Sequence, residues 1–214
     1  TVRDLLAHQG MVHRWATAVV RGEDAGDGSS YAAQGRDSDD LLGWFDDGAT
    51  ALLQALADAP ADLDVFFFLK DAGPARDAWA RRQCHESTIH AVDAMAARLG
   101  RPPSAAEVWF STEVALDGID ELVLGFLPRG RTPLRSERPR TIVVAPEDSE
   151  RRWTVQVSQA PPVTTASAHP DPDLTLRGSA RDLYLGLWNR GGEVRAEGDT
   201  AAYDLWRDLM KVTW

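Results

Sequence analysis

The residues best suited to chemistry lie in one segment, "RRQCHESTIHAVDA" (81–94), which has the pattern of a long helix. At about 100° per residue, Glu86 and His90 lie about 40° apart around the helix axis, and Asp93 follows one turn later on the same face. A carboxylate and an imidazole among apolar neighbours are costly to desolvate unless they are paired or bound to a metal. The spacing therefore favours Glu86 and His90 as metal ligands, with Asp93 as the acceptor that orients an imidazole.

A different zinc motif is excluded by the same geometry. The letters HESTIH are one residue longer than the HExxH signature of zinc proteases, so His85 and His90 point about 140° away from each other. We predict that His85 points outward, as does His13, which lies five residues after His8. Cys84 is predicted to face away from the ligand pair as a buried, inert thiol.

A third candidate ligand, His8, lies on the apolar stripe of another predicted helix. That helix covers residues 1–22, and its stripe has spacings of three and four residues: Leu5, His8, Val12, Trp15 and Val19. Two helices of a bundle that present His8 on one side and Glu86 with His90 on the other could supply three ligands. Such a set leaves a coordination position open, as a catalytic zinc requires.

Simpler interpretations of these residues stay open at this point. His8 could be a hydrogen-bonded structural histidine in a helical core. Glu86 could pair with Arg82, which lies four residues earlier on the same helix face. Periodicity alone does not distinguish these roles from metal binding.

Hydrophobic periodicity predicts a helical first half and a mixed second half. The predicted helices of the first half cover 1–22, 39–58 and 74–100, with a loop rich in Gly, Asp and Ser between the first two. A capping box of Ser104 and Glu107 predicts a helix, or a pair of helices, reaching residue 127. Four strands and two helices are expected beyond it: strands 141–145, 153–159, 174–178 and 194–198, and helices 179–190 and 200–210.

The change from a helical first half to a second half with both strands and helices predicts two domains, 1–103 and 104–214. The expected fold class is an up-down helical bundle followed by a small α+β domain with about four strands.

Composition excludes several classes of function. Of 214 residues, 43% are hydrophobic and 26% charged, and the net charge of −10 lacks the basic field of a nucleic-acid-binding protein. No apolar run approaches 18 residues, so we expect no membrane span. One cysteine and no visible signal peptide favour a reducing, cytoplasmic location. Only Lys70 and Lys211 are lysines among 23 basic residues, which is typical of a GC-rich, for example actinobacterial, genome.

Several motifs together resemble a known family. "TVRDLLAHQGMVHRW", "RRQCHESTIHAVDA", "LDGIDEL" (116–122), "LYLGLWNR" (183–190) and "EGD" (197–199) are similar to segments of the mycothiol-dependent maleylpyruvate isomerases, a branch of the DinB-like metal-binding bundles. The resemblance implies a bundle that holds a divalent metal, usually zinc, through His8, Glu86 and His90. It also implies a C-terminal domain like that of sterol-carrier proteins. Family members carry a helix before the segment that opens this chain, so we expect the first bundle helix to be missing here.

The chemistry implied by the resemblance is thiol activation. Metal coordination would lower the pKa of the thiol of mycothiol, and the thiolate would attack a small electrophile in an isomerisation or a thiol transfer. Arg190 and Arg82 are candidates for binding anionic groups of the thiol or the substrate. Two alternatives remain: a non-catalytic module that binds a small ligand in its second domain, and a hydrolase or lyase that uses metal-bound water.

Overall fold

The chain divides into two compact units, which are described separately. In the computed structural model, which describes residues 1–70 and 72–212, the first unit comprises Thr1–Arg98 and the second begins at Leu99. The predicted fold class is confirmed, because helices alone build the first unit, whereas the second combines helices with a sheet. That residues 1–103 and 104–214 are separate domains stays a prediction.

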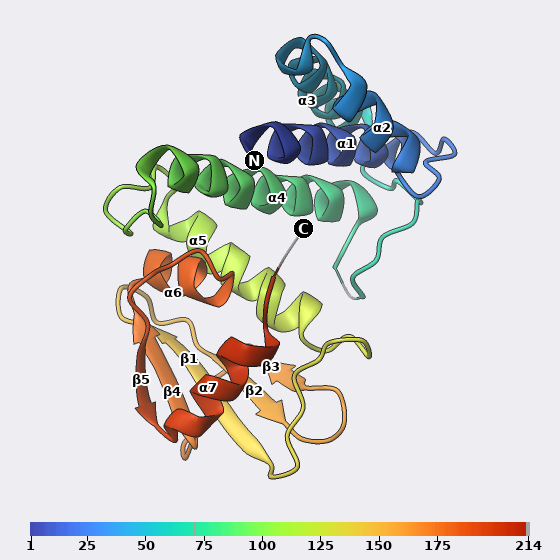
Figure 1. Cartoon of the computed structure of the whole chain (residues 1–214). Coiled ribbons are helices and arrows are strands. Elements are labelled where there is room, and N and C mark those ends of the chain that lie inside the picture. The colour runs from blue at the N-terminus through green and yellow to red at the C-terminus, as the bar shows by residue number, and fades with distance from the viewer. Residues whose placement is uncertain (71, 213–214) are drawn as a thin grey trace. The chain divides into compact units, whose positions relative to one another are not determined.

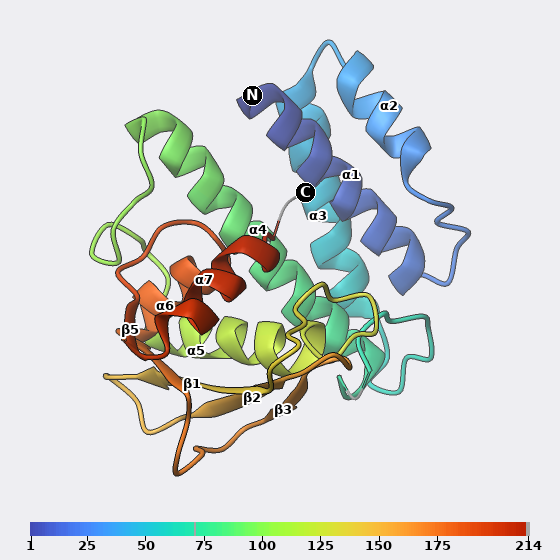
Figure 2. The ribbon, with the colours of Figure 1, turned by 60° about the horizontal axis from the view of Figure 1, so that its bottom comes forward.

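The first unit is built from the helices α1 to α4. Their bounds are Val2–Val20, Ser29–Asp37, Leu41–Asp58 and Ala75–Leu99 (Figure 1). Helix α1 packs against both α2 and α3 (Figure 2). Helix α2 corrects the sequence analysis, which assigned the whole segment between α1 and α3 to a loop. Its weakly apolar sequence, with one buried residue, Gly35, gives little periodic signal. A helix of this kind is stabilised mainly by tertiary packing.

A shared core connects α1, α3 and α4. Ala16 and Val20 of α1, Leu52 of α3 and Trp79 of α4 are buried in one apolar cluster. Trp79 is fully buried, and its indole N–H donates to the carbonyl of Phe66 at 2.9 Å. A large aromatic residue with its polar atom satisfied fixes the start of α4 against α1. This packing holds the two helices that carry the predicted ligands.

The second unit contains a mixed sheet of five strands in the order β3-β2-β1-β4-β5. The bounds are Arg140–Pro146 (β1), Trp153–Val157 (β2), Val163–Thr165 (β3), Leu174–Gly178 (β4) and Arg195–Gly198 (β5). The β1–β4 pair is parallel, with Val144 opposite Leu176, and the other pairs are antiparallel. The four predicted strands are present, and β3 was missed because its three residues are too few to show a periodic pattern.

Helices α5, α6 and α7 accompany this sheet (Figures 1 and 2). They cover Thr112–Asp120, Ala180–Leu187 and Thr200–Leu209. α6 packs against β4 and β1, and α7 packs against β4 and β5.

The predicted helix start at Ser104 is wrong. Ser104 donates from its backbone N–H and its hydroxyl to Glu107 at 2.8 and 2.9 Å, but this capping interaction closes a turn. The helix begins instead at Thr112, with the Ser111 hydroxyl accepting from the backbone of Val114. It continues as a π-helix, η1 (Glu121–Phe126). Among the described residues, no helix has the length and apolar character needed to cross a membrane.

Candidate metal centre

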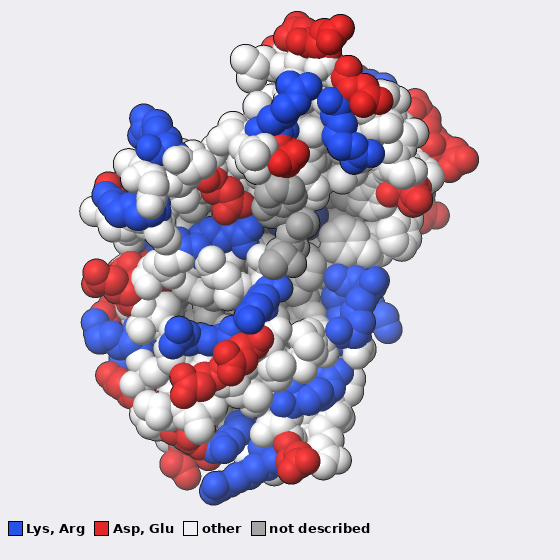
Figure 3. Space-filling view, viewed as in Figure 1, with Lys and Arg blue, Asp and Glu red and all other residues white. Residues whose placement is uncertain are grey.

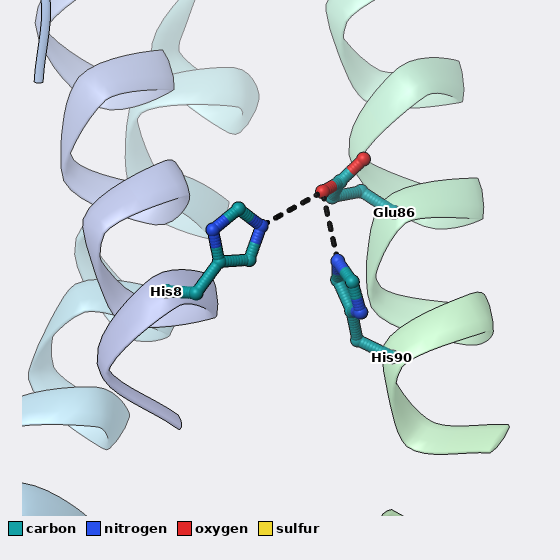
Figure 4. A group of neighbouring side chains, drawn as sticks. All are labelled: His8, Glu86 and His90. Carbon is teal, nitrogen blue, oxygen red and sulfur yellow. Dashed lines mark hydrogen bonds and ion pairs between the residues drawn. The ribbon is translucent and has the colours of Figure 1, made fainter. Parts of the chain in front are cut away.

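The three predicted ligands lie together in the first unit. One ligand atom from each of His8, Glu86 and His90 lies within 4.8 Å of the other two. Glu86 Oε1 is 3.7 Å from His8 Nε2 and 3.1 Å from His90 Nε2 (Figure 4). The two imidazoles meet edge to face, with ring centroids 5.1 Å apart. His8 comes from α1, whereas Glu86 and His90 lie one turn apart on α4, so the cluster joins two helices that are distant in the sequence.

The two carboxylate oxygens of Glu86 have different partners. Oε1 faces both imidazoles, and Oε2 accepts from Arg82 Nη2 at 3.2 Å, one turn earlier on α4. The salt bridge offered above as a simpler interpretation therefore coexists with the cluster. Arg82 is almost completely buried and fixes the orientation of the carboxylate.

Asp93 contacts the other side of His90. Its Oδ2 lies 3.0 Å from His90 Nδ1, one turn further along α4. With Asp93 at Nδ1 and Glu86 at Nε2, a protonated His90 can donate to a carboxylate from each ring nitrogen, and a metal would replace the proton on Nε2. This is the geometry that orients a histidine ligand, and the role of Asp93 toward a metal stays a prediction.

Electrostatics make the cluster attractive to a positive charge. Burial raises the pKa of Glu86, but the adjacent imidazoles of His8 and His90 and the charge of Arg82 outweigh burial and lower it. For His90, burial lowers the pKa, while Asp93 and Glu86 raise it, and the net shift is upward. The same carboxylates that hold a proton on His90 would stabilise a bound cation. Protons and a metal should therefore compete for this site.

The donor set fits a divalent cation. Zinc binds imidazole nitrogen and carboxylate oxygen at about 2.0–2.2 Å, which places neighbouring ligand atoms of a tetrahedral site roughly 3.4 Å apart. The separations of 3.7 and 3.1 Å around Glu86 Oε1 lie on either side of that value. Two imidazoles and one carboxylate leave one position of such a site to another molecule.

A cavity of about 220 Å³ gives access to His8 from the α1–α2 side. Ala7, Met11 and Ala32 provide apolar walls, and Asp4 and Arg36 provide one charge of each sign. The side chain of His8 is 21% exposed and lines this cavity, whereas its Nε2, which faces Glu86, is buried. An apolar cavity with few polar groups beside a ligand cluster is a usual form for a small-molecule site.

A second polar pair in the first unit was missed by the sequence analysis. Gln9 Nε2 lies 2.9 Å from His13 Nε2 and donates to Ser87 Oγ at 3.3 Å. His13 is 3% exposed, so the prediction that it points outward is wrong. Burial and the nearby Arg14 lower the pKa of His13 to about 4. The available signal was a stripe one residue away from the predicted one, namely Gln9, His13, Ala16 and Val20.

Two further predictions on α4 are wrong. His85 is 1% exposed instead of outward-facing, and Cys84 is exposed instead of buried. The buried residues of α4 cover a wide arc that includes both Ala78 and Trp79. A single apolar stripe underestimates the buried side of such a helix.

Arg190 lies in the second unit, just after α6. Its Nη1 donates to the carbonyls of Trp188 and Val212 at 2.7 and 2.6 Å. Arg190 thus links Val212 to Trp188, the residue at which α6 ends. A role for Arg190 in binding an anionic substrate or thiol stays a prediction.

Comparisons with known proteins identify the family. Residues 1–95 match the mycothiol maleylpyruvate isomerase N-terminal domain, and residues 113–205 match the C-terminal domain of the same family. No curated protein matches the chain. A solved structure of a sec-alkyl sulfatase double mutant is 12% identical over 93% of this chain and 32% of that chain, with a TM-score of 0.36. This chain thus spans about a third of that protein's length, and so low a score carries no argument. On the two domain matches, the chain belongs to the mycothiol maleylpyruvate isomerase family.

Proposed function

We propose that this protein is a divalent-metal-dependent and mycothiol-dependent isomerase, or thiol S-transferase, that acts on a small electrophile. The observation that carries the proposal is the convergence of His8, Glu86 and His90, whose ligand atoms lie within 4.8 Å of one another. The family supports the thiol and the reaction class, since both of its domains match this chain. The donor set supports zinc or a similar divalent ion.

Each residue of the centre has a distinct part in this proposal. His8, Glu86 and His90 would hold the cation, Asp93 orients the imidazole of His90, and Arg82 fixes the second oxygen of Glu86. When bound, a divalent cation lowers the pKa of a coordinating thiol and supplies thiolate near neutral pH. The cavity beside His8 would hold the electrophile against the apolar surface of Ala7 and Met11.

Both proposed reactions begin with the formation of one carbon–sulfur bond, and only the isomerisation later breaks it. In the isomerisation, the sulfur of mycothiol adds to a carbon of an activated double bond, and the resulting single bond rotates. Loss of the sulfur with the bonding electron pair then regenerates the double bond and the thiolate. In a transfer, the carbon–sulfur bond persists, and a leaving group departs from that carbon with its electron pair.

Elemental analysis of the purified protein tests the metal site. We expect about one equivalent of divalent metal per chain, as one such ligand set binds one ion, and its loss in His8→Ala. His169→Ala is the matched control, because His169 lies in the second unit and is only partly buried. Equal metal content in the His8→Ala variant and the native protein would contradict the proposal.

Activity assays with and without mycothiol test the nucleophile. Metal-dependent turnover of a small electrophile that requires mycothiol supports the proposed class. Turnover that is unchanged when mycothiol is omitted would instead identify a hydrolase or lyase that uses metal-activated water.

A further inference from the structure

The second unit contains a cavity of about 200 Å³ whose lining residues all belong to that unit. Leu122, Trp188 and Met210 form its apolar walls and are 1%, 4% and 7% exposed. The indole N–H of Trp188 donates to the carbonyl of Gly118 at 3.1 Å. Since this polar atom is already satisfied within the fold, the rest of the Trp188 ring presents an apolar surface.

Three cationic side chains, those of Arg129, Arg131 and Lys211, also line this cavity. None of its described lining residues is acidic. In the part of the chain that the structure describes, neither Arg131 nor Lys211 forms an ion pair with an acidic side chain. Burial, together with the charge of Arg131, lowers the pKa of Arg129, which indicates that the two guanidinium groups repel each other. Lys and Arg side chains are spread over the face of the second unit in Figure 3, with Asp and Glu side chains between them.

The backbone around the cavity departs from regular structure on two sides. One wall, with Leu122, comes from the π-helix η1, where the backbone N–H of Leu127 donates to the carbonyl of Leu122 at 3.0 Å. The other irregular residue is Asn189, which follows the lining residue Trp188 and is the one described non-glycine residue with positive φ, at 62°. π-Helical turns and strained residues of this kind occur frequently at functional sites.

Asn189 and Arg190 secure the wall formed by residues 210–212. Asn189 Oδ1 accepts from the backbone N–H of Val212 at 2.6 Å, and Arg190 Nη1 donates to the carbonyl of Val212 at 2.6 Å. The backbone N–H and the carbonyl of Val212 are thus both bound by side chains of residues that follow α6. This clamp keeps Met210 and Lys211 beside the cavity without a helix or a strand at that position.

We propose that this cavity binds a small carboxylate with one aromatic ring or a short apolar chain. The apolar body would contact Leu122, Trp188 and Met210, and the carboxylate would bind to the cations, with Arg131 the principal partner. A cavity of about 150 Å³ holds a benzene-sized ligand, and drug-sized ligands need about 300–1,000 Å³, so the volume fits one ring with its carboxylate. This site is additional to the metal centre of the proposed function.

Titration of the full-length, metal-free protein with benzoate tests the site. Chelation removes any bound metal, which could otherwise bind the carboxylate of benzoate. Binding can be followed by calorimetry and by NMR shifts of the second unit. We expect saturable binding of benzoate, at least about tenfold weaker binding of the neutral isostere benzamide, and a loss of about tenfold in Arg131→Gln. Arg138→Gln is the matched control, because Arg138 lies in the same loop, is exposed and does not line the cavity.

Three outcomes would overturn the proposal. They are the absence of saturable benzoate binding, equal binding of benzamide, and equal losses in Arg131→Gln and Arg138→Gln. Metal-free His8→Ala separates the two sites, since it should bind benzoate as the native protein does. A loss of benzoate binding in that variant would assign the binding to the metal centre.

Discussion

At the scale of single residues, Glu86 determines the electrostatic character of the candidate metal centre. One oxygen accepts from Arg82, while the other is shared by two imidazoles from different helices. The carboxylate therefore stays ionised in a largely apolar bundle, because burial is outweighed by hydrogen bonds and by a buried guanidinium. The space between Glu86 Oε1 and the Nε2 atoms of His8 and His90 is suited to a proton or to a metal cation. Protons and metal would therefore compete for it.

Asp93→Asn should weaken zinc binding about 10–100-fold, the usual effect of removing a carboxylate that orients a histidine ligand. The amide keeps the shape of the side chain but removes the charge that stabilises His90. Competition with a chromophoric chelator measures the affinity. Asp62→Asn is the control, because Asp62 is exposed and remote from the centre in the sequence. Similar affinities in the two variants would show that Asp93 has no part in metal binding.

His13 should make the metal-free protein less stable as the pH falls from 6.5 toward 4. Burial lowers the folded-state pKa from 6.5 to about 4, so the unfolded chain binds a proton in this range and the folded chain does not. The contribution of neutral His13 to the free energy of unfolding is fully present above pH 6.5. Between pH 6.5 and 4 about 3 kcal/mol of it is lost, at 1.36 kcal/mol per pKa unit. Arg14, His90 and Glu86 also act on the pKa of His13, the last by raising it.

Urea unfolding between pH 4.5 and 7 measures this effect. The variant His13→Phe removes the titrating group and keeps a ring beside Phe45, which lies 5.2 Å from His13 between ring centroids. Its stability should depend less on pH across this range than that of the native protein. Parallel pH profiles for the two proteins would contradict the assignment.

At the scale of elements, two different faces of α1 make contacts that matter for the candidate site. His8 faces α4 and the cavity toward α2, while Gly10 lies against the ring of Trp44 from α3. That ring is held by Arg14, whose guanidinium lies 3.8 Å above it and donates to the carbonyl of Trp44 at 2.6 Å. Packing against α3 thus sets the position from which α1 presents His8.

Gly10→Ala should destabilise the protein by about 1–3 kcal/mol, the range for overpacking a tight contact. A Cβ at this position would overlap the Trp44 ring, and Arg14 restricts the movement of that ring. The resulting displacement of α1 should also weaken zinc binding. Gly130→Ala is the control, since a Cβ there meets no atom within 4 Å. Urea unfolding and chelator competition measure the two effects, and equal behaviour of the two variants would exclude this packing role.

At the scale of the whole molecule, the two units have separate features. The first contains the candidate ligands on α1 and α4, and the second contains the sheet and the cation-lined cavity. A ligand that binds only the folded form stabilises it in proportion to the logarithm of its concentration above the dissociation constant. Stabilisation by metal should therefore be concentrated in the unit that contains the ligands.

Hydrogen exchange with and without zinc should show this difference. At a free zinc concentration of about 100 times the dissociation constant, binding contributes about 2.7 kcal/mol. Backbone amides of α1 and α4 should exchange more slowly, whereas those of β1 and β4 should change little. Protection that increases mainly in the sheet would place the metal elsewhere.

The sequence by itself determined the relations within one helix. Glu86, His90 and Asp93 share a face of α4 because helical geometry fixes the angle between residues three and four apart. The strands of the second unit were equally predictable where buried and exposed residues alternate. β3 was not, because a segment of three residues is too short to show such an alternation.

The tertiary structure alone decided which side of each helix is buried and what meets across helices. The 3.7 Å between His8 and Glu86, the buried Gln9–His13 pair and the exposed Cys84 all depend on the packing of α1 and α4. The formation of α2 also depends on packing, here against α1, because its own sequence gives too weak a periodic signal to predict a helix. Local periodicity acts within a few turns of one helix, whereas these contacts join residues far apart in the sequence that only the folded core brings together.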